Sequence, residues 1–158
     1  MRLIQKIIFI GILLQGLFFG SITGHSLIDK TANYKDTCKC NYNCWPDLKD
    51  SINGLSIIQI YRFLKTISLD CENNAEFSEC SNDRLFKIME LNSNNFLIAI
   101  DTYSKDLEIG EILSQIKRPV NDSINLKGIY TKIQKSKVES GLKDQILKLL
   151  KYSIDLNK

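Results

Sequence analysis

The sequence predicts an all-α fold: a compact bundle of four to six helices, stapled by disulfides near its N-terminal end. Three observations lead to this class. Apolar residues recur at helical spacing over much of the chain, and no segment shows the strict apolar–polar alternation of a β-hairpin. All five cysteines lie between residues 38 and 80, which places the staple at one end.

The start of the chain predicts a secretory signal peptide over residues 1–24. A short basic head precedes an apolar run over residues 7–19, and small polar residues follow. That run is shorter than the roughly 20 residues that a membrane-spanning helix needs, which argues against the alternative of an uncleaved anchor. We therefore expect residues 25–158 to form a single secreted, extracellular helical domain with no stable membrane insertion after cleavage.

The charge of the chain excludes some partners. Removal of Arg2 and Lys6 with the signal peptide lowers the net charge from +3 to about +1. A nearly neutral domain is not typical of proteins that bind nucleic acid or an anionic surface.

The cysteines predict disulfide bonds, because clustered cysteines in a small secreted chain are normally oxidised. They are Cys38, Cys40, Cys44, Cys71 and Cys80. Their spacing fits a zinc site poorly. The single histidine, His25, stands beside the predicted cleavage point, so we expect the folded body of the domain to have no imidazole that could activate a thiol.

Five cysteines allow two bridges and one remaining thiol. Cys38 and Cys40 are too close to pair without strain. The simplest arrangement joins the N-terminal cluster to Cys71 and Cys80. The remaining thiol is then either buried and inert or free to join two chains in a disulfide-linked dimer.

The first element predicted is a long helix that starts near Pro46, carries its apolar pattern from Leu48 and ends near SLDC, residues 68–71. Pro46 suits its start, and apolar residues recur at helical spacing up to Ile67, although Gly54 weakens the pattern. Residues 72–83 then predict a polar loop held by its two flanking cysteines.

The middle of the chain predicts a short helix and leaves one segment open. Asp83 is a candidate N-cap for a helix that carries Leu85, Phe86 and Met89, and the asparagine-rich residues 92–95 end it. The apolar run FLIAI, residues 96–100, fits either a buried helical turn or a strand.

The last third predicts three one-sided helices that need partners to cover their apolar faces. Pro119 ends the first, and residues 121–123 offer caps for the second. Their apolar positions are Ile109, Ile112, Leu113 and Ile116; Leu126, Ile129, Tyr130 and Ile133; and Leu142, Ile146, Leu149 and Leu150.

The motifs of common enzymes are missing from the sequence. It contains no phosphate-binding loop, no dinucleotide fingerprint and no H-E-x-x-H motif. The carboxylate pair Glu108 and Glu111 is more typical of a solvated helix face than of a hydrolase. We therefore expect no enzymatic activity, no cofactor and no bound metal. Asn121 opens an Asn-Asp-Ser sequon in a predicted surface loop and is a candidate for glycosylation.

Three segments resemble helical cytokines of the interleukin-10 family, in particular those of the interleukin-20 kind. DLKDSINGLSIIQIYRFLK (47–65), which follows a cysteine, is similar to the first helix of that family, and NDRLFKI (82–88) is similar to a helix end. YTKIQKSKVESGLKDQILKLLKYS (130–153) is similar to the last loop and helix. The chain departs from the family at Lys143-Asp144, where the family has Gly-Glu, and in lacking cysteines in its middle helices.

The resemblance implies a helical bundle that engages class II cytokine receptors as an agonist or a decoy. The chain has 23 Ile against 3 Ala and 17 Lys against 4 Arg, a bias typical of AT-rich coding and common in viruses and parasites. The leading hypothesis is therefore a secreted, non-enzymatic binding protein: a cytokine-like ligand, or a viral or parasite mimic of one, acting on a cell-surface receptor or another secreted protein.

The alternative is a secreted helical carrier of small apolar ligands. The spacings Cys40-x3-Cys44 and Cys71-x8-Cys80 also occur in insect odorant-binding proteins. Those proteins have six cysteines and end soon after the last one, whereas this chain continues to residue 158. A secreted binding protein of some other kind also fits the sequence.

Overall fold

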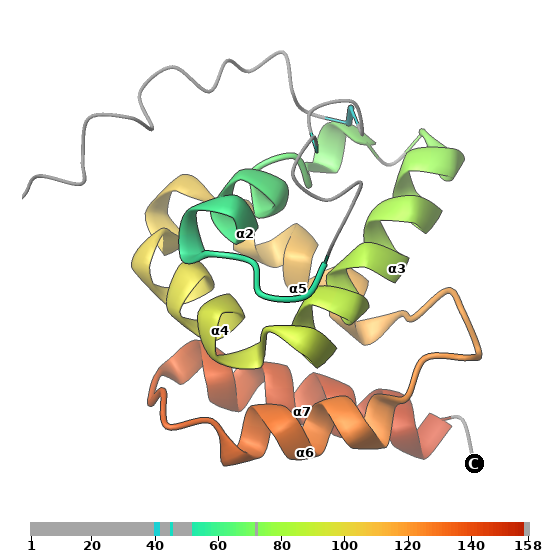
Figure 1. Cartoon of the computed structure of the whole chain (residues 1–158). Coiled ribbons are helices and arrows are strands. Elements are labelled where there is room, and N and C mark those ends of the chain that lie inside the picture. Colours follow the sequence, from blue (N-terminus) through green and yellow to red (C-terminus); the bar gives the residue numbers. More distant parts are fainter. Residues whose placement is uncertain (1–39, 42–44, 46–51, 72, 157–158) are drawn as a thin grey trace, which may run out of the picture. The chain divides into compact units, whose positions relative to one another are not determined.

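The computed structural model describes residues 40–41, 45, 52–71 and 73–156. All of them lie in one compact unit of the chain. The described residues form six α-helices and two short 3-10 helices and contain no strand, which confirms the predicted all-α class (Figure 1). The predicted signal peptide lies outside the described residues, as do Cys38 and Cys44.

The elements follow one another with short connections. They are α2 (Ile57–Leu64), η5 (Leu69–Cys71), α3 (Ala75–Leu91), α4 (Ser93–Thr102), η6 (Ser104–Asp106), α5 (Ile109–Lys117), α6 (Leu126–Lys135) and α7 (Gly141–Leu156). α2 packs on α4, and α7 lies along both α5 and α6. In Figure 1, α6 and α7 run side by side below the other helices.

The predicted first helix is too long: α2 begins only at Ile57. Gly54 adopts a φ of +77°, which other residues rarely adopt, and this breaks the helix before Ser56. Ser56 and Gln59 then form a capping box: Ser56 Oγ accepts from the Gln59 N–H at 3.3 Å, and Gln59 Oε1 accepts from the Ser56 N–H at 2.9 Å.

Asparagine side chains hold the residues that precede α2 in an irregular path. Leu55 N–H donates to Asn92 Oδ1 at 2.9 Å, and Asn92 Nδ2 donates to the Ile52 carbonyl at 2.6 Å. Asn95 Nδ2 donates to the Leu55 carbonyl at 2.8 Å. Because these backbone groups are satisfied by side chains from the α3–α4 junction, the segment does not need helical hydrogen bonds.

The predicted polar loop over residues 72–83 is also wrong, because most of it belongs to α3. Asn74 caps the helix by accepting from the Phe77 N–H at 3.0 Å. Phe77, Ser81 and Leu85 are all fully buried, so the spacing i, i+4, i+8 gives α3 an inward face although its composition is mostly polar.

α4 settles the open assignment of FLIAI, which is helical. Asn92 is the only residue between α3 and α4, and its N–H donates to the Ile88 carbonyl at 2.8 Å. Of FLIAI, only Ile98 is not buried; Phe96 and Ile100 are fully buried. The apolar run FLIAI therefore belongs to a mostly buried helix and not to a strand.

The three predicted C-terminal helices are confirmed as α5, α6 and α7. α5 ends before Pro119, as predicted. α6 is capped by Asn125 rather than by residues 121–123, since Asn125 Oδ1 accepts from the Gly128 N–H at 3.0 Å. A Cβ at position 128 would lie 2.5 Å from Asn125 Nδ2, so glycine suits this cap.

The densest part of the core lies between α2, α3 and α4. The largest side chains that are fully buried all come from these helices, except Ile67, which lies between α2 and η5. They are Phe63, Phe77, Phe86, Phe96, Ile60, Leu64, Ile67, Leu85, Ile88, Met89, Leu97 and Ile100. The helices α5 to α7 cover this core with their isoleucine and leucine stripes, as their spacing predicts.

Lys143 is buried near the connection between α6 and α7. Its side chain is only 6% exposed, and its Nζ donates to the carbonyl of Ser136, the C-cap of α6, at 2.8 Å. The lysine therefore stabilises the negative end of α6.

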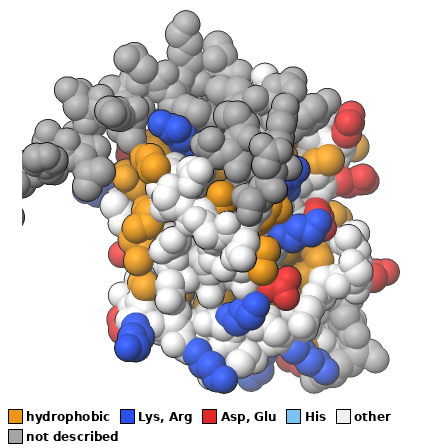
Figure 2. All heavy atoms as spheres, viewed as in Figure 1, with side chains coloured by type: hydrophobic (Ala, Val, Ile, Leu, Met, Phe, Trp, Pro, Cys, Tyr) orange, Lys and Arg blue, Asp and Glu red, His pale blue; other side chains and the backbone are white. Residues whose placement is uncertain are grey.

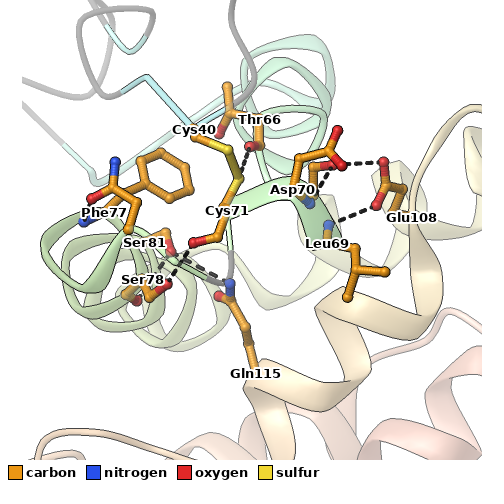
Figure 3. The surroundings of a disulfide bond; sticks show 12 residues. Cys40, Thr66, Leu69, Asp70, Cys71, Phe77, Ser78, Ser81, Glu108 and Gln115 are labelled. Carbon is orange, nitrogen blue, oxygen red and sulfur yellow. Dashed lines mark hydrogen bonds between the residues drawn. A yellow bond between two sulfur atoms is a disulfide. The ribbon is translucent and has the colours of Figure 1, made fainter.

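The contacts around the disulfide between Cys40 and Cys71 meet at Thr66, which is fully buried (Figure 3). The Thr66 carbonyl accepts from the Cys40 N–H at 3.2 Å and lies 3.7 Å from Cys71 Sγ. Thr66 Oγ1 donates to the Phe63 carbonyl at 2.7 Å and accepts from Trp45 Nε1 at 2.9 Å. Trp45, which is also buried, packs against the rings of Phe63 and Phe77 at centroid distances of 5.2 and 5.4 Å.

We expect Thr66→Val to destabilise the chain by about 1–3 kcal/mol, because Trp45 Nε1 keeps its burial but loses its acceptor. Urea unfolding followed by far-UV circular dichroism measures the change. The matched control is Thr131→Val on the exposed side of α6, for which we expect a change within about 0.5 kcal/mol. Equal stability of the two variants would contradict a structural role for the Thr66 hydroxyl.

Candidate partner-binding surface

The cysteine prediction is partly correct. Cys40 and Cys71 form a disulfide, with Cα atoms 5.2 Å apart and a sequence separation of 31. The predicted bridge to Cys80 is wrong: Cys80 is free and exposed, so of the two alternatives left open for the remaining thiol the buried, inert one does not apply. It lies on the outer side of α3, next to the fully buried Ser81, so it cannot reach the staple.

Peptide mapping without reduction tests this pairing. We expect a cross-linked pair of peptides that contain Cys40 and Cys71, and maleimide labelling of Cys80 in the folded protein, because only that thiol among the described cysteines is exposed. Cys80→Ser should lose this label and keep the cross-link. A cross-link between Cys80 and Cys40 or Cys71 would contradict the structure.

Asn121, the glycosylation candidate, lies in an exposed turn after α5. Its Oδ1 accepts from the Ser123 N–H at 2.9 Å and from Ser123 Oγ at 2.8 Å. A hollow of about 590 Å³ beside it is lined by acidic residues and Cys80: Glu79, Cys80, Asp83, Val120, Asn121 and Asp122. A glycan at this position would therefore stand close to the Cys80 thiol.

Glu108 is exposed and Glu111 is only partly buried, in keeping with the solvated helix face that was expected. Glu108 accepts from Ser68 Oγ and from the Leu69 N–H, each at 2.8 Å, and so ties the start of α5 to η5 (Figure 3). These contacts give Glu108 a structural role. Within the described residues, no group of three His, Cys, Asp or Glu side chains is placed to hold a metal ion.

A groove between α5 and α7 is the surface feature that sequence reasoning missed. It encloses about 440 Å³ and has a mostly apolar lining. Its residues come from the last two turns of α5 and the middle of α7: Leu113, Ser114, Lys117, Arg118, Gln145, Lys148 and Leu149. We call it the α5–α7 groove. Leu113 and Leu149 were predicted as core residues, but both are only partly buried.

The exposed apolar surface continues along α7 beyond the groove. Tyr152 is 47% exposed and Leu156 is 65% exposed, and both follow Leu149 at helical spacing, so they share its side of the helix. Lys117 Nζ lies 5.2 Å from the centre of the Tyr152 ring, a cation–π contact that joins α5 to this strip.

Buried polar side chains hold the end of α5 in place. Asn82 on α3 is 2% exposed; its Nδ2 donates to the carbonyls of Gln115 at 3.0 Å and Arg118 at 3.2 Å. Its Oδ1 accepts from the Val120 N–H at 3.1 Å. From the other side, Ser153 Oγ on α7 donates to the Lys117 carbonyl at 2.9 Å. These bonds satisfy carbonyls that a helix end otherwise leaves free.

Positive charge is concentrated in the last two helices. Residues 126–156 contain seven lysines and three acidic residues, a net charge of +4, whereas the whole chain carries +3. α3, by contrast, contains four acidic and two basic residues. In Figure 2, lysine and arginine side chains gather along the lower edge of the face in view, over α6. The small net charge of the chain therefore hides a basic region.

Comparison with known proteins finds no relative: no protein-family model, no curated protein and no solved structure matches this chain. Among the described residues, none of the helices has both the length and the apolar character that a membrane span requires.

The position of Arg118 depends on Asn82, and Asn82→Asp tests this. The substitution removes both amide donors and sets a carboxylate against two carbonyl oxygens, so we expect a loss of at least about 2 kcal/mol in the free energy of unfolding. Asn94→Asp, at an exposed position of α4, is the matched control and should change stability by less than about 0.5 kcal/mol. Similar losses in both variants would contradict the assigned role.

Proposed function

We propose that this chain is a secreted helical ligand that binds a protein on the surface of a cell, in the manner of a helical cytokine, and catalyses no reaction. The observation that carries the proposal is the α5–α7 groove together with Tyr152 and Leu156. An apolar strip that stays exposed along a pair of packed helices is typical of a protein-binding site.

The scaffold supports this proposal. The Cys40–Cys71 bridge closes a loop of about 30 residues and should contribute about 3–4 kcal/mol, which is useful to a small secreted domain and unusual in a reducing compartment. A rigid core of aromatic and aliphatic side chains holds the helices that form the groove. Such a scaffold presents a preorganised surface and lowers the entropic penalty of binding.

The open form of the surface hollows favours a ligand over a carrier. A carrier needs an enclosed apolar cavity. The α5–α7 groove and the acidic hollow beside Cys80 are open to solvent. A third, of about 490 Å³ and also open, is lined by polar and apolar residues in equal number around Asn121 and Asn125. These features favour contact with another surface rather than storage of a small molecule.

The first test is native mass spectrometry of the protein secreted from eukaryotic cells. We expect a chain cleaved after residue 24, a glycan on Asn121 and no bound small molecule, because the core is filled by its own side chains. Alkylation without reduction reports the free thiol in the same sample. An adduct of lipid mass that dissociates on denaturation would contradict the proposal and favour ligand transport.

The second test is binding to cells by flow cytometry with the tagged protein. We expect saturable binding that is lost when the cells are treated with trypsin. Ser114→Trp fills the groove without removing a core contact and should weaken binding by at least about tenfold. Asn94→Trp, exposed on α4, is the matched control and should bind as the wild type does. Equal binding by both variants would remove the groove from the proposal.

A further inference from the structure

The charges around the α5–α7 groove define the kind of partner that it fits. We propose that the groove binds an acidic amphipathic segment of a protein: a helix or extended stretch whose apolar side chains are flanked by carboxylates. This inference rests on the proposed function and names the chemistry of the partner.

The floor of the groove requires apolar groups from the partner. Leu113 on α5 and Leu149 on α7 both line it, and both pack against the core, so the floor is held in place. Covering two leucines releases ordered water only if the partner supplies apolar surface of similar size. A sulfated polysaccharide or a nucleic-acid backbone has no such side chains.

The rim of the groove requires negative charge from the partner. It carries Lys117, Arg118 and Lys148, and none of the residues that line the groove is acidic. Neither Arg118 nor Lys148 forms an ion pair with any residue that the structure describes. Both are exposed, so they remain available to carboxylates. Arg118 is suited to a bidentate contact with a carboxylate.

The rim cations are held at defined positions. The Asn82 amide fixes the backbone of Arg118, and the ring of Tyr152 lies under the ammonium group of Lys117. Ser114 and Gln145 add neutral hydrogen-bonding groups between the cations. The basic surroundings of α6 and α7 should also speed the approach of an acidic partner at low salt.

Three cations around two leucines make a small site, and this favours a short protein segment over a long polyanion. A polyanion gains affinity by neutralising many charges along its length. The groove offers few charges but a definite apolar floor. Specificity would then come from the leucine contacts, and the association rate from the charges.

Fluorescence anisotropy with a labelled peptide tests the inference. The probe is a helical peptide of about 16 residues, with leucine at every third or fourth position and glutamate at the others. The protein is the secreted full chain after signal cleavage. We expect the protein to bind this peptide, and to bind the same peptide with glutamine in place of glutamate at least about tenfold more weakly. The affinity for the glutamate peptide should fall as NaCl rises from about 50 to about 300 mM.

Two double variants serve as test and control. Arg118→Glu with Lys148→Glu should weaken peptide binding by about tenfold or more, because it reverses the rim. Lys127→Glu with Lys135→Glu, on the exposed side of α6, makes the same change in net charge and should weaken binding by no more than about twofold. Circular dichroism and thermal unfolding confirm that both variants are folded.

Several results would overturn the inference. They are equal affinity for the glutamate and glutamine peptides, equal binding by the two double variants, or no binding by the wild type at any peptide concentration up to about 1 mM. Tighter binding to heparin that Ser114→Trp leaves unchanged would assign the rim to polyanions. Concentration-dependent dimers that Arg118→Glu with Lys148→Glu abolishes would assign the groove to a second copy of the chain.

The same variants separate this inference from the proposed function. Cell binding that Ser114→Trp abolishes but the rim reversal leaves intact would retain the proposed function and overturn the acidic partner. Specific peptide binding without any cell binding by the wild type would retain the chemistry of the groove and overturn the proposed function.

Discussion

Thr66 is the residue on which the N-terminal part of the structure depends. It has left the helical ladder at the end of α2, so its carbonyl and hydroxyl are available to other segments. The carbonyl receives the N–H of Cys40, and the hydroxyl receives the indole N–H of Trp45. One buried residue thus connects α2 to the disulfide and to the aromatic cluster that faces α3. The bridge to Cys71 fixes the chain just before α3 begins, so the staple sets the direction of that helix.

Polar side chains play a similar part at the other end of the molecule. At the end of α5, the Gln115 carbonyl accepts from Asn82 Nδ2 on α3, and the Lys117 carbonyl accepts from Ser153 Oγ on α7. Burial of an amide and a hydroxyl is tolerated because each is satisfied. The result is a specific placement of the last turn of α5 against two neighbouring helices. That turn carries two of the cations of the α5–α7 groove, so the buried hydrogen bonds determine the geometry of the surface.

The sequence predicted the helices whose signal is local and failed where distant residues decide. α5, α6 and α7 each carry a regular apolar stripe and a nearby stop or cap, so their spacing was sufficient. The start of α2 depends on Asn92 and Asn95, which are about 40 residues away and cannot be recognised as its partners from the sequence. The first half of α3 was missed because its inward face includes Ser81 and Asn82, which look like loop residues until their partners on α5 are known. The pairing of Cys71 rather than Cys80 has the same origin, since the helical path of α3 turns Cys80 outward.

The groove could not be predicted because it arises from incomplete burial of residues that look like core. Leu113 and Leu149 belong to regular apolar stripes, and a stripe does not reveal where its neighbour ends. Full coverage of both leucines would need a further element over α5 and α7, and none of the described residues provides it. Around these two leucines lie the cations Lys117, Arg118 and Lys148. Neither Arg118 nor Lys148 forms an ion pair with a described residue. Exposure of the two leucines to water is unfavourable. The positive charge around them limits the chemistry of a partner that can cover them. A partner that supplies both apolar side chains and carboxylates satisfies both requirements, whereas a purely apolar or a purely anionic one satisfies only one.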